Sequence, residues 1–230
     1  MSSVIQFAVV LAIGLGACAQ PETQPVEPKP TGSSYAYVWA ADPDSADSDF
    51  LAVLDVDEGS YRYGAVVATL PVGVSGMAHH TEHAMPEGSR LVANSFEAGQ
   101  TFVFNLADPL NPFVERSFEG IGEYTYPHSF ERTASGNILA TFQTEGEGNE
   151  LTGGLVELDP LGNLVRSSDA GDPDAPEIRA YSLGLIPDLD RVVTTTSDMN
   201  MVQVSKWIQI WRLSDLKLLH TIELPPGPKG

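Results

Sequence analysis

The sequence FLAVLDV at residues 50–56 is rich in side chains that favour β-strands, and it has three counterparts further along the chain. These are TFVFNL at 101–106, GLVELD at 154–159 and WIQIWRL at 207–213. The four runs begin 51, 53 and 53 residues apart, and the chain between them shows no sustained helical period. A repeat of about fifty residues is typical of proteins that assemble one β unit several times.

Each of these runs lies between two further strand-like runs. The preceding runs are residues 36–39, 90–93, 137–140 and 191–194, and the following runs are residues 65–70, 113–118, 163–166 and 217–222. Units with three or four antiparallel strands are typical of β-propeller blades. We therefore predict an all-β protein, a β-propeller with about four blades near residues 35–75, 76–120, 121–170 and 171–226. A β-sandwich is the alternative fold, but it does not explain so regular a repeat.

Four of the five histidines lie in segments between the blades that we expect to form the innermost strands. These segments are residues 76–85, 124–131 and 179–185. They contain His79, His80, His83 and His128, whereas His220 lies on a predicted outer strand as a surface or packing residue. With one inserted residue in the first segment, His80 and His128 fall at the same repeat position, which Ser182 takes in the third segment.

Imidazoles that converge from adjacent blades can bind copper, zinc or iron. In a regular strand His79 and His80 point to opposite faces, so their joint use requires a β-bulge or a strand end. His83 is a further candidate ligand from the following turn. Glu82 or Glu131 is expected to accept a hydrogen bond from a histidine ring and fix its tautomer. The alternative is that the histidines only bond to the backbone and bind no metal.

Two other groups of residues have structural interpretations. One is an acidic loop that lacks the glycine and the spacing of an EF-hand, so we expect a solvated turn; it contains Asp42, Asp44, Asp47 and Asp49. The other is a pair of tryptophans on one face of a predicted strand, Trp207 and Trp211, which we expect to pack between blades.

The N-terminus has the features of an export signal. Residues 4–17 are apolar except for Gln6, and this run is too short to span a bilayer comfortably. The sequence LGAC at 15–18 resembles a bacterial lipobox, so we predict a signal peptide at 1–17 and lipidation of Cys18. Residues 18–34 read as a proline-rich linker. This predicts an exported protein of the bacterial cell envelope, held to the membrane only by lipid and facing the periplasm or cell exterior. The alternative is an ordinary secretory signal with an incidental cysteine.

Composition limits the possible partners. The chain has 230 residues, with 31 acidic and 12 basic side chains and a formal net charge of −19, which disfavours binding to nucleic acid. A single cysteine excludes an internal disulfide framework and a zinc site of the Cys₄ or Cys₂His₂ type.

Several motifs resemble those of the selenium-binding protein / methanethiol oxidase family. Residues 49–57 (DFLAVLDVD), with Tyr63-Gly64 and Leu70-Pro71, resemble the opening blade of that family. His79-His80 resembles its double-histidine motif, and His128-Ser129 followed by Ala134-Ser135-Gly136 resembles its next histidine motif. Residues 208–211 through 221–224 resemble a blade with a tryptophan-containing strand. The resemblance implies a seven-bladed propeller, and His79, His80 and His128 as ligands of copper in a methanethiol oxidase.

The chain departs from that family at two points. The cysteine motif after the double histidine is absent, because the chain reads Thr81-Glu82-His83-Ala84-Met85, so cysteine-mediated selenium binding is not expected. A later family histidine would lie beyond Gly230, and four blades of seven lead us to expect a fragment. The resulting hypothesis is a copper-dependent oxidase of a small sulfur-containing substrate, with zinc or iron as other possible metals. The alternative is a non-enzymatic propeller that binds a small ligand or a partner protein.

Overall fold

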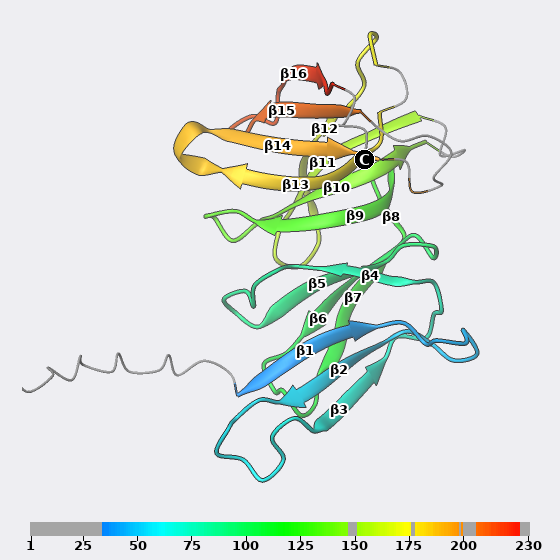
Figure 1. Cartoon of the computed structure of the whole chain (residues 1–230), viewed down its shortest axis with the longest axis vertical. Coiled ribbons are helices and arrows are strands. Elements are labelled where there is room, and N and C mark those ends of the chain that lie inside the picture. The colour runs from blue at the N-terminus through cyan, green and yellow to red at the C-terminus, as the bar shows by residue number, and fades with distance from the viewer. Residues whose placement is uncertain (1–33, 147–150, 176–177, 198, 200–205, 226–230) are drawn as a thin grey trace, which may run out of the picture. The chain divides into compact units, whose positions relative to one another are not determined.

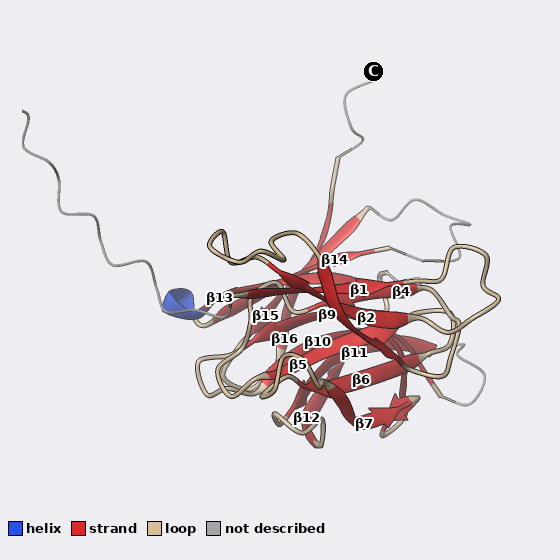
Figure 2. Cartoon of the chain, turned by 90° about the horizontal axis from the view of Figure 1, so that it is seen from below, coloured by secondary structure: helices blue, strands red, loops and turns tan. Residues whose placement is uncertain are grey.

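Strands and turns make up almost all of the chain that the structure describes (Figure 2). The computed structural model describes residues 34–146, 151–175, 178–197, 199 and 206–225. The predicted signal peptide, Cys18 and the linker up to residue 33 lie outside these ranges. Within them there is one short 3₁₀ helix, η1 (Pro187–Leu189), and no helix long and apolar enough to span a membrane.

The strands form four antiparallel sheets, which follow one another along the chain (Figure 1). The first sheet contains β1 (Tyr35–Ala40), β2 (Phe50–Asp55) and β3 (Val66–Pro71). The second contains β4 (Ala78–Thr81), β5 (Arg90–Ser95), β6 (Gln100–Asn105) and β7 (Phe113–Phe118). The third contains β8 (Gly120–Ile121), β9 (Tyr124–Arg132), β10 (Ile138–Glu145), β11 (Leu151–Leu158) and β12 (Leu164–Asp169). The fourth contains β13 (Ala180–Ile186), β14 (Arg191–Thr196), β15 (Trp207–Arg212) and β16 (Leu218–Glu223).

These sheets confirm the prediction of an all-β protein with about four repeated blades. The runs that begin the sequence repeat form β2, β6, β11 and β15, and each is hydrogen-bonded to a strand on either side. The histidine-bearing segments form β4 and β9, which precede the strands of the repeat in the second and third sheets. In the fourth sheet β13 takes that place, whereas the first sheet begins directly with β1 among the described residues.

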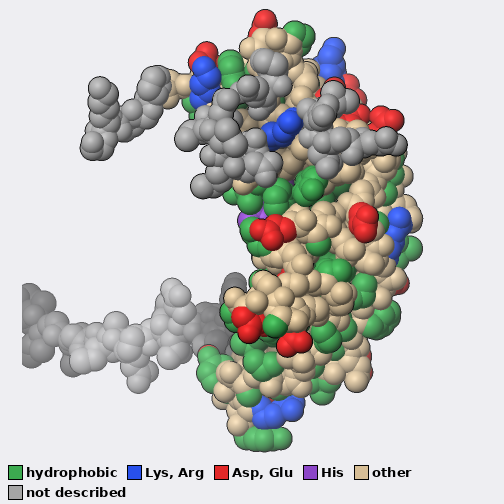
Figure 3. Space-filling view, turned by 90° about the vertical axis from the view of Figure 1, so that its right-hand side faces the viewer, with side chains coloured by type: hydrophobic (Ala, Val, Ile, Leu, Met, Phe, Trp, Pro, Cys, Tyr) green, Lys and Arg blue, Asp and Glu red, His purple; other side chains and the backbone are tan. Residues whose placement is uncertain are grey.

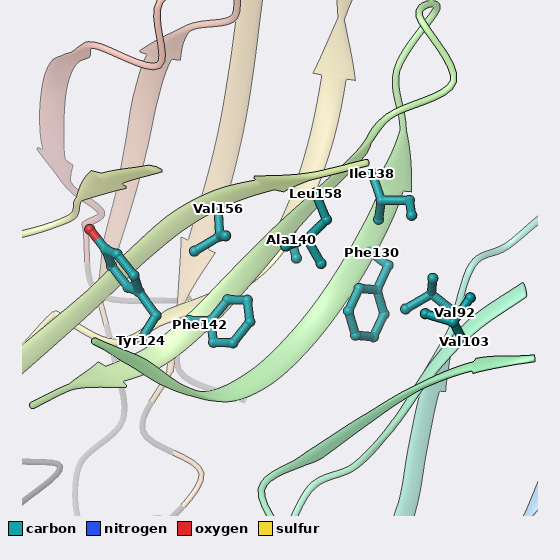
Figure 4. Close-up of a cluster of buried hydrophobic side chains, with 9 residues drawn as sticks. All are labelled: Val92, Val103, Tyr124, Phe130, Ile138, Ala140, Phe142, Val156 and Leu158. Atoms are coloured by element: carbon teal, nitrogen blue, oxygen red, sulfur yellow. The ribbon is translucent and has the colours of Figure 1, made fainter. Parts of the chain in front are cut away.

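Apolar side chains fill each interface between successive sheets. Leu51 of β2 packs with Phe102 and Phe104 of β6, which joins the first sheet to the second. A second cluster joins the second sheet to the third and contains Val92, Val103, Tyr124, Phe130, Ile138, Ala140, Phe142, Val156 and Leu158 (Figure 4). A third cluster joins the third sheet to the fourth and includes the fully buried Trp211. Neighbouring sheets therefore cover each other's faces, as stacked repeats require.

The burial pattern across a sheet explains the sequence pattern. In β5 and β10, which lie inside their sheets, nearly every residue is buried, including the polar Asn94 and Gln143. In the outermost strands β7 and β12 exposed residues alternate with less exposed ones, so one face of each meets solvent. Trp207 and Trp211 both pack into the cluster between the third and fourth sheets, which confirms the packing role predicted for them.

The acidic loop between β1 and β2 divides into an exposed and a buried part. The Asp42 carboxylate accepts hydrogen bonds from the backbone N–H groups of Ala46 and Asp47, at 2.9 and 3.0 Å, as in a solvated turn. Asp49 does not belong to that turn, because it is fully buried and accepts a hydrogen bond from the Ser95 hydroxyl at 2.9 Å. The prediction for Asp49 was wrong because its carboxylate joins the first sheet to the second.

Candidate metal site

Each of the strands β4, β9 and β13 contains a β-bulge at the same place. In β4, Ala78 pairs with Ser95 and Thr81 pairs with Ala93, so His79 and His80 together face Asn94. The corresponding bulge of β9 places His128 and Ser129 opposite Thr141. That of β13 places Tyr181 and Ser182 opposite Thr195. The bulge that the joint use of His79 and His80 requires is therefore present.

The residue opposite each bulge bonds to it in the same way. Asn94 Oδ1 accepts a hydrogen bond from the His80 backbone N–H at 2.8 Å. The Thr141 hydroxyl accepts one from the Ser129 N–H at 3.0 Å, and the Thr195 hydroxyl accepts one from the Ser182 N–H at 3.2 Å. These bonds satisfy a backbone donor that the bulge leaves without a ladder partner. The bulge is thus a feature of the repeat unit.

This geometry corrects the predicted alignment of the repeats. His79 and His128 are equivalent, because each is the first bulge residue and lies two positions after a residue in the left-handed region, Met77 (φ 63°) or Tyr126 (φ 54°). His80 corresponds to Ser129 and Ser182, not to His128. The prediction was off by one residue because it allowed one inserted residue in the first segment. His79 lies 15 positions before Asn94, whereas His128 lies 13 positions before Thr141, so the first hairpin is longer by two residues.

Three histidines from two sheets come together at these bulges. The Nε2 atoms of His79 and His128 lie 3.0 Å apart. The ring centroids are 4.2 Å apart for His79 and His80, 4.8 Å for His79 and His128, and 4.5 Å for His80 and His128. One nitrogen from each ring can be chosen so that all three lie within 4.8 Å of one another.

Burial keeps these imidazoles neutral. It lowers the pKa of His79, and together with the nearby His79 and His83 it lowers the pKa of His80 to about 4. Burial, with the neighbouring His80 and His79, lowers the pKa of His128 to about 3. A neutral imidazole carries a lone pair on one ring nitrogen, which is the form that binds metal. At neutral pH all three rings are therefore able to act as ligands.

Aromatic rings and one hydroxyl fix the orientation of the cluster. His128 is fully buried, its Nδ1 lies 3.1 Å from the Ser129 Oγ, and its ring centroid lies 3.9 Å from that of Tyr181. Phe96 lies beside the cluster, with its centroid 5.7 Å from that of His79. These contacts restrict rotation of the rings and cover part of the cluster from water.

The remaining predicted site residues lie elsewhere. His83 is exposed in the turn after β4, and His220 is exposed on β16, as predicted for a surface residue. Glu82 is buried, but its carboxylate binds Arg132 at 2.7 and 2.8 Å and the Val92 N–H at 3.0 Å. Its predicted role as the acceptor for a histidine ring is therefore wrong, because a cation on β9 already occupies it. Glu131 is half-buried on β9, and no described histidine ring donates a hydrogen bond to it.

The sequence interpretation missed three residues of this site, Asn94, Phe96 and Tyr181. Asn94 bonds to the His80 bulge, and the Tyr181 ring lies against the His128 ring at an interplanar angle of 36°. Asparagine is depleted in strands, so its place in the buried run Arg90–Ser95 was an available signal. Tyr181 had no comparable signal, because only the bulge places it beside the histidines.

The three imidazoles fit a metal ion. Two nitrogens that each lie about 2.1 Å from one ion are at most about 4.2 Å apart. The ligand nitrogens here lie within 4.8 Å of one another, so small movements of the rings would allow all three to bind one ion. His80 Nε2 is buried and has no hydrogen-bond partner, and such an orphaned acceptor or donor is costly unless something binds it. Three protein ligands also leave a coordination position open for a substrate.

Comparison with known proteins agrees with the motifs and the fold. No protein-family model matches the chain. Over 84% of its length the chain is 26% identical to methanethiol oxidase of Hyphomicrobium sp., of which the match covers 49%. The chain thus spans about half the length of this curated relative. This match confirms the resemblance to the selenium-binding protein / methanethiol oxidase family.

Solved structures show the same fold. A hypothetical selenium-binding protein from Sulfolobus tokodaii superposes with a TM-score of 0.69 at 17% identity, covering 84% of this chain and 49% of that one. A protein from Lactobacillus plantarum superposes with a TM-score of 0.62 at 10% identity, covering 86% of this chain and 55% of that one. At these identities the likeness establishes the fold alone.

Proposed function

We propose that this chain is part of a copper-dependent oxidase of small thiols, with dioxygen as the electron acceptor and His79, His80 and His128 as the metal ligands. The observation that carries the proposal is the cluster of three neutral imidazoles, one buried and two half-buried, whose ligand atoms lie within 4.8 Å of one another. The 26% identity to a methanethiol oxidase supports the choice of a small sulfur compound as substrate.

The donor set and the substrate class together favour copper. Imidazole suits copper, zinc and iron alike, whereas a thiolate substrate is a soft ligand that favours copper. When bound, copper would supply a redox-active Lewis acid that binds sulfur.

The protein's own contribution is to hold and shield the ligands. The bulges of β4 and β9 direct histidines from two sheets towards one point. Ser129 and Tyr181 restrict the His128 ring, and Phe96 gives the site an apolar side that suits a methyl-bearing sulfur compound.

The proposal includes no nucleic-acid partner, because a formal net charge of −19 repels phosphates. On the face shown in Figure 3, the described basic side chains lie singly among acidic and apolar ones. On this face they form no continuous basic patch.

Export and lipid anchoring are a further part of the proposal. The apolar run at residues 4–17 followed by Cys18 supports a lipoprotein signal, with residues 18–34 as a tether in the cell envelope. In this arrangement the domain would meet small thiols outside the cytoplasm.

The test begins with metal binding by the purified protein. Metal content is measured after mild purification, and the metal-free protein is then titrated separately with Cu(I), Cu(II) and Zn(II). The proposal expects one tightly bound ion per chain and methanethiol-dependent uptake of dioxygen by the copper form. Failure to bind any of these ions would refute the proposal and leave the histidines as structural residues of a ligand-binding propeller. Tight zinc binding without copper binding would refute the oxidase and retain the metal site.

A further inference from the structure

We infer that Asn94 is a positioning residue, which sets the spacing between the two strands that carry the histidines. The inference rests on the proposed metal site. Asn94 contributes no metal ligand in this view, and it acts by holding the backbone on both sides of the cluster.

A single carboxamide bonds to both histidine strands. Asn94 Oδ1 accepts the hydrogen bond from the His80 N–H at 2.8 Å, and Asn94 Nδ2 donates one to the Pro127 carbonyl at 2.6 Å. The Pro127 carbonyl belongs to the peptide bond that leads into His128. The His80 N–H lies in the peptide group between His79 and His80, so the two hydrogen bonds lie on peptide groups that adjoin all three proposed ligands.

Asn94 is itself held in place. Its side chain is fully buried, and its backbone carbonyl accepts a hydrogen bond from Trp39 Nε1 of the first sheet at 2.8 Å. The carboxamide is planar, so its donor and acceptor keep a fixed separation once its main chain is fixed. It can therefore hold β4 and β9 at a fixed separation. A metal site needs this, because its ligands must be placed to within about 0.5 Å.

The next sheet provides an internal comparison. Thr141, at the equivalent position, accepts from the Ser129 N–H and donates to the Tyr181 carbonyl at 2.6 Å. A hydroxyl therefore makes a similar bridge, to the carbonyl one repeat position further along the next strand, where that strand carries no histidine at its bulge. The longer carboxamide lies where histidines face each other across two sheets.

The experiment separates the two hydrogen bonds. Asn94→Asp keeps an acceptor for the His80 N–H and replaces the donor to Pro127 by an oxygen. Asn94→Thr introduces the hydroxyl that serves at position 141, with a shorter reach. The control is Thr195→Val, which removes the same bond to a bulge without histidines. Affinity for Cu(I) and Zn(II) is measured by competition with chelators, and the histidine rings of the metal-free proteins are followed by ¹⁵N NMR.

Both Asn94 variants are expected to lose 10- to 100-fold in metal affinity, about the range seen when groups that orient ligands are removed, whereas Thr195→Val keeps its affinity. The His79 and His128 ring resonances should shift in the metal-free Asn94 variants and not in the control. Affinity within twofold of wild type in a folded Asn94 variant would overturn the inference. If Asn94→Asp does not fold, Asn94→Thr decides alone, since its hydroxyl satisfies one buried peptide group but has a shorter reach than the carboxamide that spans both strands.

The NMR measurement also separates this inference from the proposed function. If the unaltered protein binds no metal, the metal site is wrong, but ring shifts in the Asn94 variants still support positioning of the histidine strands. Unchanged ring resonances in those variants would reject positioning whatever the metal results.

Discussion

His79 Nε2 lies 3.0 Å from His128 Nε2, although 49 residues separate the two histidines in the sequence. They belong to different sheets and occupy equivalent positions in successive repeats. At this distance the two nitrogens form a hydrogen bond, in which one ring donates and the other accepts. The contact therefore depends on the packing of the second sheet against the third.

Alanine at the clustered histidines should abolish tight metal binding. His79→Ala, His80→Ala and His128→Ala each remove one of three ligands, so we expect at least a 100-fold loss of affinity, measured by chelator competition. His83→Ala and His220→Ala are the controls, because both histidines are exposed and outside the cluster. Wild-type affinity in any of the three cluster variants would exclude that residue as a ligand.

The metal-free protein should lose stability as pH falls from about 6.5. The pKa values of His80 and His128 are lowered to about 4 and about 3, whereas the unfolded chain takes up protons near pH 6.5. Below pH 6.5 the unfolded state therefore binds more protons than the folded state, and the free energy of unfolding decreases with pH. Urea unfolding between pH 7 and pH 4 measures this dependence.

The variant His128→Gln isolates the histidine contribution to that pH dependence. Its carboxylates titrate as in the unaltered protein, so the difference between the two unfolding curves reports the histidine. We expect the variant to lose less stability on acidification. Parallel curves for the two proteins would contradict the lowered pKa of His128.

The ion pair between Glu82 and Arg132 should contribute strongly to stability. It joins the second sheet to the third, and the two side chains are 3% and 18% exposed. Glu82→Gln leaves the arginine charge without a counter-ion, so we expect a loss of about 3 kcal/mol in the free energy of unfolding. The matched control is Glu115→Gln, which removes the more exposed pair with Arg90 and should change the unfolding midpoint little. Equal effects of the two variants would refute a special role for the buried pair.

Cys18→Ser should release the protein from the membrane. We expect the unaltered protein, expressed in a Gram-negative bacterium, to incorporate labelled fatty acid and fractionate with membranes. The serine variant lacks the thiol that lipidation requires, so it should carry no label and leave the membrane fraction. Label in the serine variant, or an unlabelled wild type in the soluble fraction, would contradict lipidation at Cys18.

The sequence was sufficient to predict the strands and the three histidines of the candidate metal site. Four runs begin 51, 53 and 53 residues apart, and they form equivalent strands. The reason is that a run of β-forming residues buries its apolar side chains against the neighbouring sheet. The same repeat placed His79 and His80 on β4 and His128 on β9, because these strands hold equivalent places in successive units.

The side-chain partners could not be read in the same way. Glu82 was predicted to support a histidine, but it faces Arg132, which lies 50 residues further along the chain. Asp49 looked like one of several acidic loop residues and is fully buried against Ser95. Both contacts are made across an interface between sheets, where the pairing depends on how the sheets stack.

The sequence by itself thus determined the repeat, the strands within it and the concentration of histidines on two of those strands. Only the tertiary structure decided which histidines meet, that His79 and not His80 matches His128, and that Asn94 links their strands. The physical reason is that a bulge changes the direction of a side chain without changing the pattern of apolar residues, and that contacts between sheets form only when the sheets pack.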